Sequence, residues 1–307
     1  MVDLGALGTL MGLAFFQRSL LGGAIAALAC AAVGVFVLLR KQAMVGHGIA
    51  HVSFGGVAVG KYMVVAGVFF GAAETFPLYT ALVFAVAGMW LVTWMRRRGV
   101  ASSDAGIGLI TAVGFAIGLV VISAAGGFNR DILSYLFGDV TTIGAQDLVV
   151  SAVLGAVILA FFAVFYKEML SMTFDEESAR LTGVPVPALS VAFDLLVAFT
   201  IVLSIKVVGI VLVSALVVLP GLSAFQFRFS FRGTMVAAMA LAVLSVVVGI
   251  LLSALYPFAT GGLIILVATA FLGVCAAWVR LGDGRGEKSE NGVKSQKGEN
   301  GGGTTAR

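Results

Sequence analysis

The sequence predicts an all-α membrane protein, built as a polytopic bundle of eight or nine transmembrane helices. Three observations support this fold class. Hydrophobic residues make up 60% of the 307 positions and charged residues 11%, whereas soluble domains carry about 25% charged residues. Long apolar runs follow one another along the chain, and the basic residues gather in every second connection between them. So few charges could not cover a water-facing surface, which argues against a soluble enzyme.

The first apolar run shows the pattern. Leu20 to Leu39 contains no charge and, at 1.5 Å per residue, is long enough to cross a hydrocarbon core of ~30 Å. Arg40 and Lys41 end the run and no small-residue cleavage site follows, so it is a span rather than a secretory signal. Similar runs occupy about 76–95, 105–125, 148–166, 188–205, 207–227, 234–256 and 260–279, with a less regular one between 44 and 73.

The placement of Lys and Arg predicts the orientation, because cytoplasmic loops retain positive charge. With nine spans and an outer N-terminus, all of the 19 Lys and Arg residues except Arg18, Lys61, Arg130 and Lys206 fall on the inner side. The C-terminus is then cytoplasmic. The net charge of +4 reflects this topology, so no nucleic-acid partner is expected, and the protein's surroundings are membrane lipid.

Residues 1–279 form one predicted membrane domain, and 280–307 a cytoplasmic tail whose Gly-, Lys- and Glu-rich composition predicts disorder. Cys30 and Cys275 lie inside apolar runs, where a thiol behaves as a small hydrophobe. Glycine and serine residues repeated every four positions predict close helix packing, at Gly56/Gly60, Gly114/Gly118 and Ser245/Gly249/Ser253.

Two connections have predicted structure of their own. Residues 126–146, on the outer side, are apolar enough to dip back into the membrane. Residues 167–187 form the longest charged inner segment before the tail, and Asp175 to Leu181 has the composition of a short helix that Gly183 and Pro185 would end. The acidic first turn suits the helix dipole, so these charges fit either simple capping or docking of a partner.

The sequence contains only two histidines, His47 and His51, spaced i and i+4. On a helix this spacing places both imidazoles on one face, close enough to share a divalent metal ion. Polar ionisable groups inside a membrane segment are costly and tend to mark ion pathways, which favours a metal role over plain packing.

Two enzyme motifs nearly match in the same region. HGIAH has the histidine spacing of a zinc hydrolase, but Gly48 stands where the catalytic Glu would be; an intramembrane metallohydrolase remains an alternative reading. The segment from Gly55 to Lys61 resembles a phosphate-binding loop, yet Tyr62 replaces the Ser or Thr that would hold magnesium. Any ATP hydrolysis is therefore expected on a separate chain.

Four further polar residues fall in or near spans. Lys206 and Glu74 lie near an outer interface, where long side chains can reach the headgroups. Asp194 lies one or two turns above the inner face and is expected to pair with a cation on another helix. Lys61 is either mid-membrane or near the outer end, depending on where its span begins.

Four segments together resemble the permeases of ABC importers for zinc, manganese and iron. The likeness runs through Phe16 to Gly60 with its V-F-V-L-L-R and M-V-G-H-G-I-A-H stretches, Leu133 to Leu148 with L-S-Y-L-F-G, Ser171 to Pro185 with F-D-E-E-S-A-R-L-T-G-V-P, and Val207 to Pro220 with V-V-G-I-V-L-V-S-A-L-V-V-L-P. Several matches in the right order are more specific than any single one.

The resemblance implies the all-helical fold of the vitamin B12-type importers, in the plasma membrane of a prokaryote. It further implies a permease homodimer, a cytoplasmic ABC ATPase dimer that binds ATP, an extracytoplasmic metal-binding protein, and a divalent metal ion as transported substrate with no permanent cofactor. The ATPase-coupling element would comprise Phe174, Asp175, Glu176, Glu177, Ala179, Arg180 and Gly183. An ion-coupled secondary transporter, which would need no ATPase, is a further alternative.

The chain departs from the family pattern at two places. His47 stands where the family carries Asp, four residues before the second ligand, and the stretch after Pro220 lacks the family's Arg. Nitrogen-only ligation favours borderline metals, so zinc is expected over manganese or iron.

Overall fold

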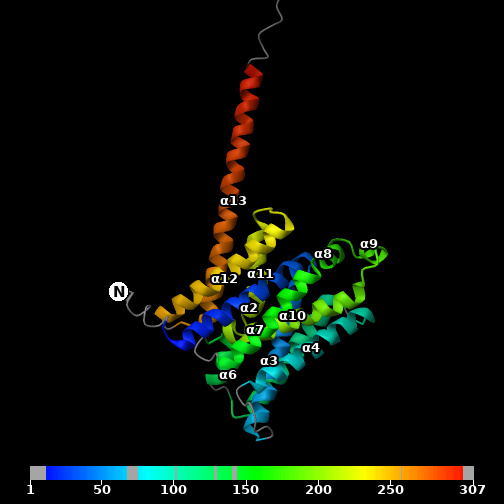
Figure 1. Cartoon of the computed structure of the whole chain (residues 1–307), viewed down its shortest axis with the longest axis vertical. Helices are drawn as coiled ribbons and strands as arrows, with labels where there is room; N and C mark the ends of the chain where they lie inside the picture. Colours follow the sequence, from blue (N-terminus) through cyan, green and yellow to red (C-terminus); the bar gives the residue numbers. More distant parts are fainter. Residues whose placement is uncertain are drawn as a thin grey trace, which may run out of the picture.

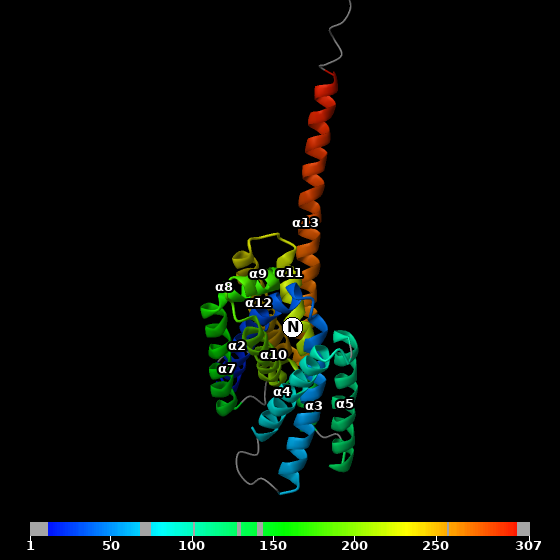
Figure 2. The same ribbon diagram turned by 90° about the vertical axis from the view of Figure 1, so that its right-hand side faces the viewer.

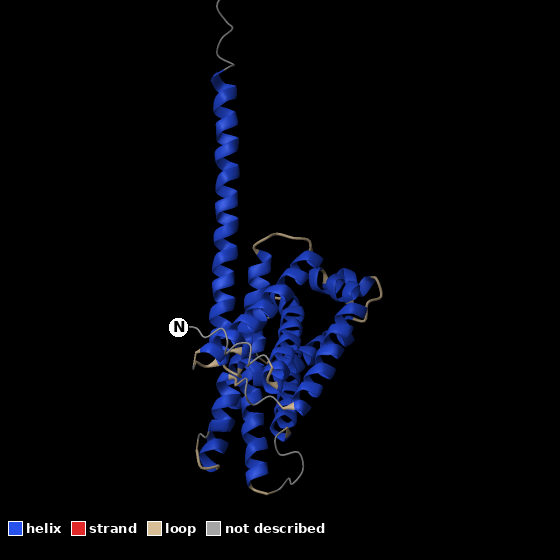
Figure 3. Cartoon of the chain, turned by 60° about the vertical axis from the view of Figure 1, so that its left-hand side comes forward, coloured by secondary structure: helices blue, strands red, loops and turns tan. Residues whose placement is uncertain are grey.

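The computed structural model describes residues 12–67, 75–100, 102–127, 130–139, 144–256 and 258–299. These residues form helices joined by loops, and no strand occurs among them (Figure 3). The helices are α2 (Ala14–Leu39), α3 (Ala43–Val65), α4 (Phe76–Arg97), α5 (Ser103–Ala124), α6 (Arg130–Phe137), α7 (Ala145–Val164), α8 (Tyr166–Phe174), α9 (Glu176–Leu181), α10 (Val186–Val208), α11 (Val213–Phe225), α12 (Phe231–Leu255) and α13 (Thr260–Glu299). The all-α fold class is confirmed.

Eight of the described helices are long and apolar enough to cross a membrane. The predicted span at 207–227 is different, because its helix, α11, has 13 residues. A helix of that length rises about 20 Å, less than a ~30 Å core. The choice between eight and nine spans thus depends on this short helix and the irregular backbone before it.

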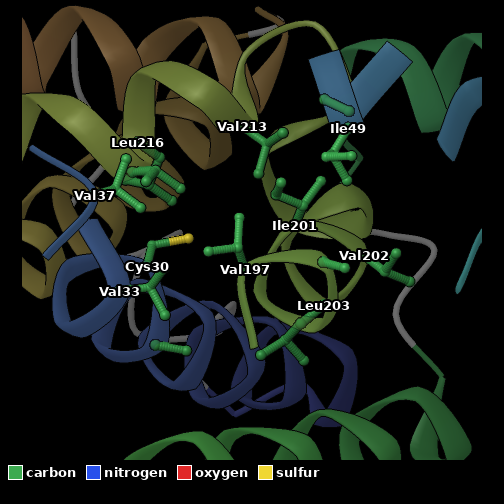
Figure 4. Close-up of a cluster of buried hydrophobic side chains, with 14 of the residues drawn as sticks. Cys30, Val33, Val37, Ile49, Val197, Ile201, Val202, Leu203, Val213 and Leu216 are labelled. Atoms are coloured by element: carbon green, nitrogen blue, oxygen red, sulfur yellow. The ribbon is translucent and has the colours of Figure 1, made fainter. Parts of the chain in front are cut away.

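Helix α2 lies at the centre of the bundle and packs against α7, α10, α11 and α12. Its middle consists of small residues, which allow these neighbours to approach closely. Figure 4 shows Cys30 and Val33 of α2 among side chains of α10 and α11, including Val197 and Leu216. Cys30 is fully buried and its sulfur lies 3.0 Å from Ser204 Oγ, as expected for a packing residue.

Helix α3 packs between α4 and α5 through the predicted glycine positions. A Cβ on Gly56 would meet the backbone of α4 at Ala81, and one on Gly114 of α5 would meet the backbone of α3 at Val52. Gly249 of α12 faces Ile264 of α13 in the same way. These glycine contacts are confirmed. Figure 2 shows α5 and α7 on opposite flanks of the bundle.

The break between α10 and α11 lies against α6. Gly209 has a φ of +88° and packs against the backbone of Leu136 and Phe137, where a side chain would not fit. The exposed backbone groups are satisfied across this contact, since Ile210 N–H donates to Tyr135 O and Val211 N–H donates to Leu136 O. Irregular backbone at membrane depth is tolerated only with such protein partners.

The helices α8 and α9, the α11–α12 connection and the C-terminal extension of α13 lie at one end of the molecule, and α6 lies at the other (Figure 1). This is the arrangement that the distribution of Lys and Arg predicts. The apolar part of α13 ends near Arg280, but its backbone continues as a helix to Glu299, projecting away from the bundle, where composition predicts disorder. The domain boundary near residue 280 and the disorder of the tail therefore stay predictions.

Candidate metal station and coupling element

His47 and His51 lie on one face of α3, in its first three turns from the end that carries α9. Their ring centroids are 4.5 Å apart and the rings are inclined at 71°. Both side chains are half-buried. The i, i+4 spacing therefore brings the two imidazoles together, as the sequence predicts.

The surroundings of the histidine pair are aromatic and small. The ring of His51 meets Phe115 of α5 edge-on, with 5.2 Å between centroids, and its Nδ1 is buried without a hydrogen-bond partner. Gly46, next to His47, has open space where a Cβ would lie. No group of three or more His, Cys, Asp or Glu residues suited to a metal occurs within the described ranges. The two imidazoles thus offer two nitrogen donors to a metal ion, and Nδ1 of His51 has no hydrogen-bond partner.

The predicted short helix at the inner end is confirmed as α9. Asp175 caps it, because its carboxylate accepts from the backbone N–H groups of Glu177 and Ser178, each at 3.1 Å. The Ser178 hydroxyl donates to the same carboxylate at 2.6 Å and, with the backbone bonds, lowers the pKa of Asp175. Gly183, at φ +86°, takes the left-handed conformation that ends the helix.

One side of α9 is anchored and the other is exposed. Ala179 is fully buried, while Leu181 is 85% exposed, and Phe174, the last residue of the neighbouring helix α8, is 69% exposed. Glu176 and Arg180 form an exposed ion pair at 2.5 Å, which contributes little to stability. Leu181 is part of this apolar exposed surface, and sequence reasoning did not single it out.

Two of the intramembrane polar residues have polar or aromatic neighbours. Lys61 lies near the end of α3, with Nζ 5.9 Å from the ring centroid of Tyr135 in α6, within cation–π range. Asp194 accepts a hydrogen bond from Thr93 Oγ1 of α4 at 2.9 Å. Its direct partner is thus a hydroxyl, while the cations Arg40, Arg96 and Arg97 interact with it electrostatically. Glu74 lies outside the described residues.

Lys206 differs from the expectation that it reaches the headgroups. Its Nζ lies 2.6 Å from Asp147 Oδ2 of α7, and the two side chains are only 11% and 8% exposed. The same Oδ2 accepts from Gly144 N–H at 2.9 Å, so Asp147 also caps α7, and Oδ1 is buried without a partner. Sequence reasoning missed Asp147, although a carboxylate just before an apolar run was the available signal.

Taken with the long apolar helices, this arrangement defines a polytopic helical membrane protein with a short surface helix, α9, between two candidate spans. A sequence profile described as the ABC 3 transport family matches residues 12–279. The chain therefore belongs to the ABC 3 transport family, as its resemblance predicts.

Two relatives and one solved structure show how far the likeness extends. The chain is 30% identical over 260 residues to the manganese transport system membrane protein MntC of Halalkalibacterium halodurans, covering 85% of this chain and 86% of the relative. It is 29% identical over 262 residues to the high-affinity zinc uptake system membrane protein ZnuB of Haemophilus influenzae, covering 85% and 96%. The structure of PsaBC from Streptococcus pneumoniae in complex with Fab has a TM-score of 0.78 and 23% identity, covering 90% of this chain and 98% of that chain. The last comparison confirms the fold.

Proposed function

We propose that this chain is the membrane-spanning permease subunit of an ATP-powered importer of a divalent metal ion, with zinc preferred over manganese. Membership of the family and relatives named for manganese and zinc transport support the class of substrate. The observation that carries the proposal is the His47–His51 pair on α3, with one unsatisfied imidazole nitrogen.

Two protein ligands suit a transported ion. A transporter must replace part of the ion's hydration shell and yet release the ion again, so water or a second copy of the chain would complete the coordination. A closed site with four protein ligands would hold zinc as a structural ion. Tight zinc binding by the isolated chain is therefore not expected.

The preference for zinc rests on the donor atoms. Imidazole nitrogen suits zinc, whereas carboxylate oxygen suits manganese. The chain places His47 where the resembled family carries Asp, so both donors are nitrogens. Changing His47 to Asp should keep transport and move the selectivity toward manganese.

The assembly follows the family pattern. In our proposal two copies of the chain form the translocation unit, α9 docks on an ATPase dimer at the cytoplasmic side, and an extracytoplasmic metal-binding protein delivers the ion. The buried Ala179 face and the exposed Phe174 and Leu181 support this role, since α9 is fixed to the bundle on one side and open on the other.

The test is metal uptake by proteoliposomes that contain the chain and its ATPase. His51→Ala should abolish zinc uptake while the complex still assembles, and zinc uptake by the wild type should fall on acidification, because a protonated imidazole cannot ligate a metal ion. Unchanged metal uptake by the His47→Ala/His51→Ala protein would show that the histidine pair does not take part in metal translocation. ATP-independent uptake would instead indicate a secondary transporter.

A further inference from the structure

A basic cavity of about 660 Å³ opens at the α9 end of the bundle. It lies between the ends of α2 and α4 and the beginning of α10, with α8 and α9 beside it. Its charged lining consists of Arg40, Lys41, Arg96, Arg97, Arg180 and Glu176. Glu176 is the one acid among these six and is already paired with Arg180, so the cavity has a strong excess of positive charge.

Arg40 forms the inner wall of the cavity. Its guanidinium lies 4.9 Å from the ring centroid of Phe193, and Nη2 donates to Ser190 Oγ at 3.3 Å, while Nη1 is buried without a hydrogen-bond partner. Burial lowers the pKa of Arg40 below its ordinary value, Asp194 and Glu176 oppose that shift, and Arg96 adds to it. Arg40 thus belongs to a cationic cluster at the cavity and keeps one buried donor atom without a hydrogen-bond partner.

The uncharged lining mixes the polar Gln42, Thr173 and Ser190 with apolar side chains at helix ends. Leu39 ends α2, Met172 belongs to α8, and Val186 begins α10. Helix α10 also directs its N-terminus, the positive end of its dipole, into this region. The cavity therefore combines cationic donors for an anion with apolar surface next to them.

We infer that this cavity binds the phosphate group of an anionic phospholipid from the inner leaflet. Basic pockets between transmembrane helices on the cytoplasmic side are a recognised form of lipid-headgroup site. Arginine donors suit phosphate oxygens, and the apolar side chains suit the glycerol and the first methylenes of the acyl chains. A bound headgroup would neutralise part of the cationic cluster.

This site is separate from the His47–His51 pair and rests on the proposed orientation, in which α9 faces the cytoplasm. A lipid here would contact α9 through Arg180 and α10 near Ser190. The lipid composition of the membrane would then influence how firmly the coupling element is held.

The experiment measures lipid binding by the full chain assembled with its ATPase, using native mass spectrometry with added phosphatidylglycerol. Arg96→Gln/Arg97→Gln removes two cavity charges on the exposed end of α4. At roughly 1 kcal/mol for each basic residue, binding should weaken about 30-fold. Arg98→Gln is the matched control, because Arg98 is an exposed neighbour outside the cavity lining, and binding should change little.

Three results would overturn the inference. Equal binding of phosphatidylglycerol to the wild type and the double variant would remove the cavity as the site. Full competition by millimolar inorganic phosphate would identify a free-anion site, and lipid binding by the chain without its ATPase that is absent from the assembled complex would identify a protein-docking surface. Weak binding of phosphatidylcholine beside strong binding of phosphatidylglycerol is the expected pattern. The assay needs no metal, so its result is independent of the transport test.

Discussion

The buried ion pair between α7 and α10 makes Lys206→Met an informative perturbation. The substitution leaves Asp147 with the Gly144 N–H as its remaining donor in the structure and places an uncompensated carboxylate in a region where both side chains are at most 11% exposed. Removing one partner of a buried pair costs about 3–5 kcal/mol. Denaturant unfolding of the purified protein in detergent should show that the free energy of unfolding falls by this amount.

Two further proteins separate the ion pair from simple loss of a side chain. Asp147→Asn/Lys206→Met removes both charges but keeps an oxygen to accept from Gly144 N–H, so its free energy of unfolding should exceed that of Lys206→Met by about 1–3 kcal/mol. Lys167→Met, at an exposed lysine of α8, should stay within about 0.5 kcal/mol of wild type. A Lys206→Met protein as stable as the Lys167 control would refute the reasoning.

Two other predictions concern the α3–α5 contact and the coupling helix. Gly114→Ala places a Cβ 2.6 Å from the Val52 Cα, so α3 and α5 must separate, and unfolding stability should fall by about 1–3 kcal/mol; Gly108→Ala, on the same helix with open space, should be nearly neutral. Equal stability of these two variants would contradict the packing argument. Glu177→Ala/Arg180→Ala should weaken association with the ATPase and uncouple transport in a pull-down and uptake assay, with membrane insertion intact. Normal association and transport would show that Glu177 and Arg180 face water and take no part in docking.

Features that depend on local sequence could be predicted. The long spans follow from apolar length alone, and α9 follows from Asp175 as a cap and Gly183 as a stop, which act within a few residues of the helix. Gly114 could be assigned to a helix contact because small residues are the means by which membrane helices approach.

Features that depend on distant partners could not be predicted. Lys206 and Asp147 are 59 positions apart, and Asp194 and Thr93 are 101 apart, so nothing local identifies either partner. The short length of α11 could not be predicted either, because the apolar run at 207–227 is long enough for a full span. Its helix is shortened by Gly209, whose φ of +88° and contact with α6 are properties of the tertiary fold.

The end of the structure that carries α9 offers a physical route between this helix, for which we propose a coupling role, and the histidine pair. Helix α9 leads through Gly183 into α10, and α10 holds Arg40 through Ser190 and Phe193. Only a tight turn, with Lys41 at φ +55°, separates Arg40 from the start of α3, which bears His47 in its second turn. Because packed helices and buried side chains move as units rather than deforming continuously, a shift of α10 would displace Arg40 and with it the first turns of α3. Arg40 also lines the basic cavity. An anion bound there would therefore influence the connection between α10 and the start of α3.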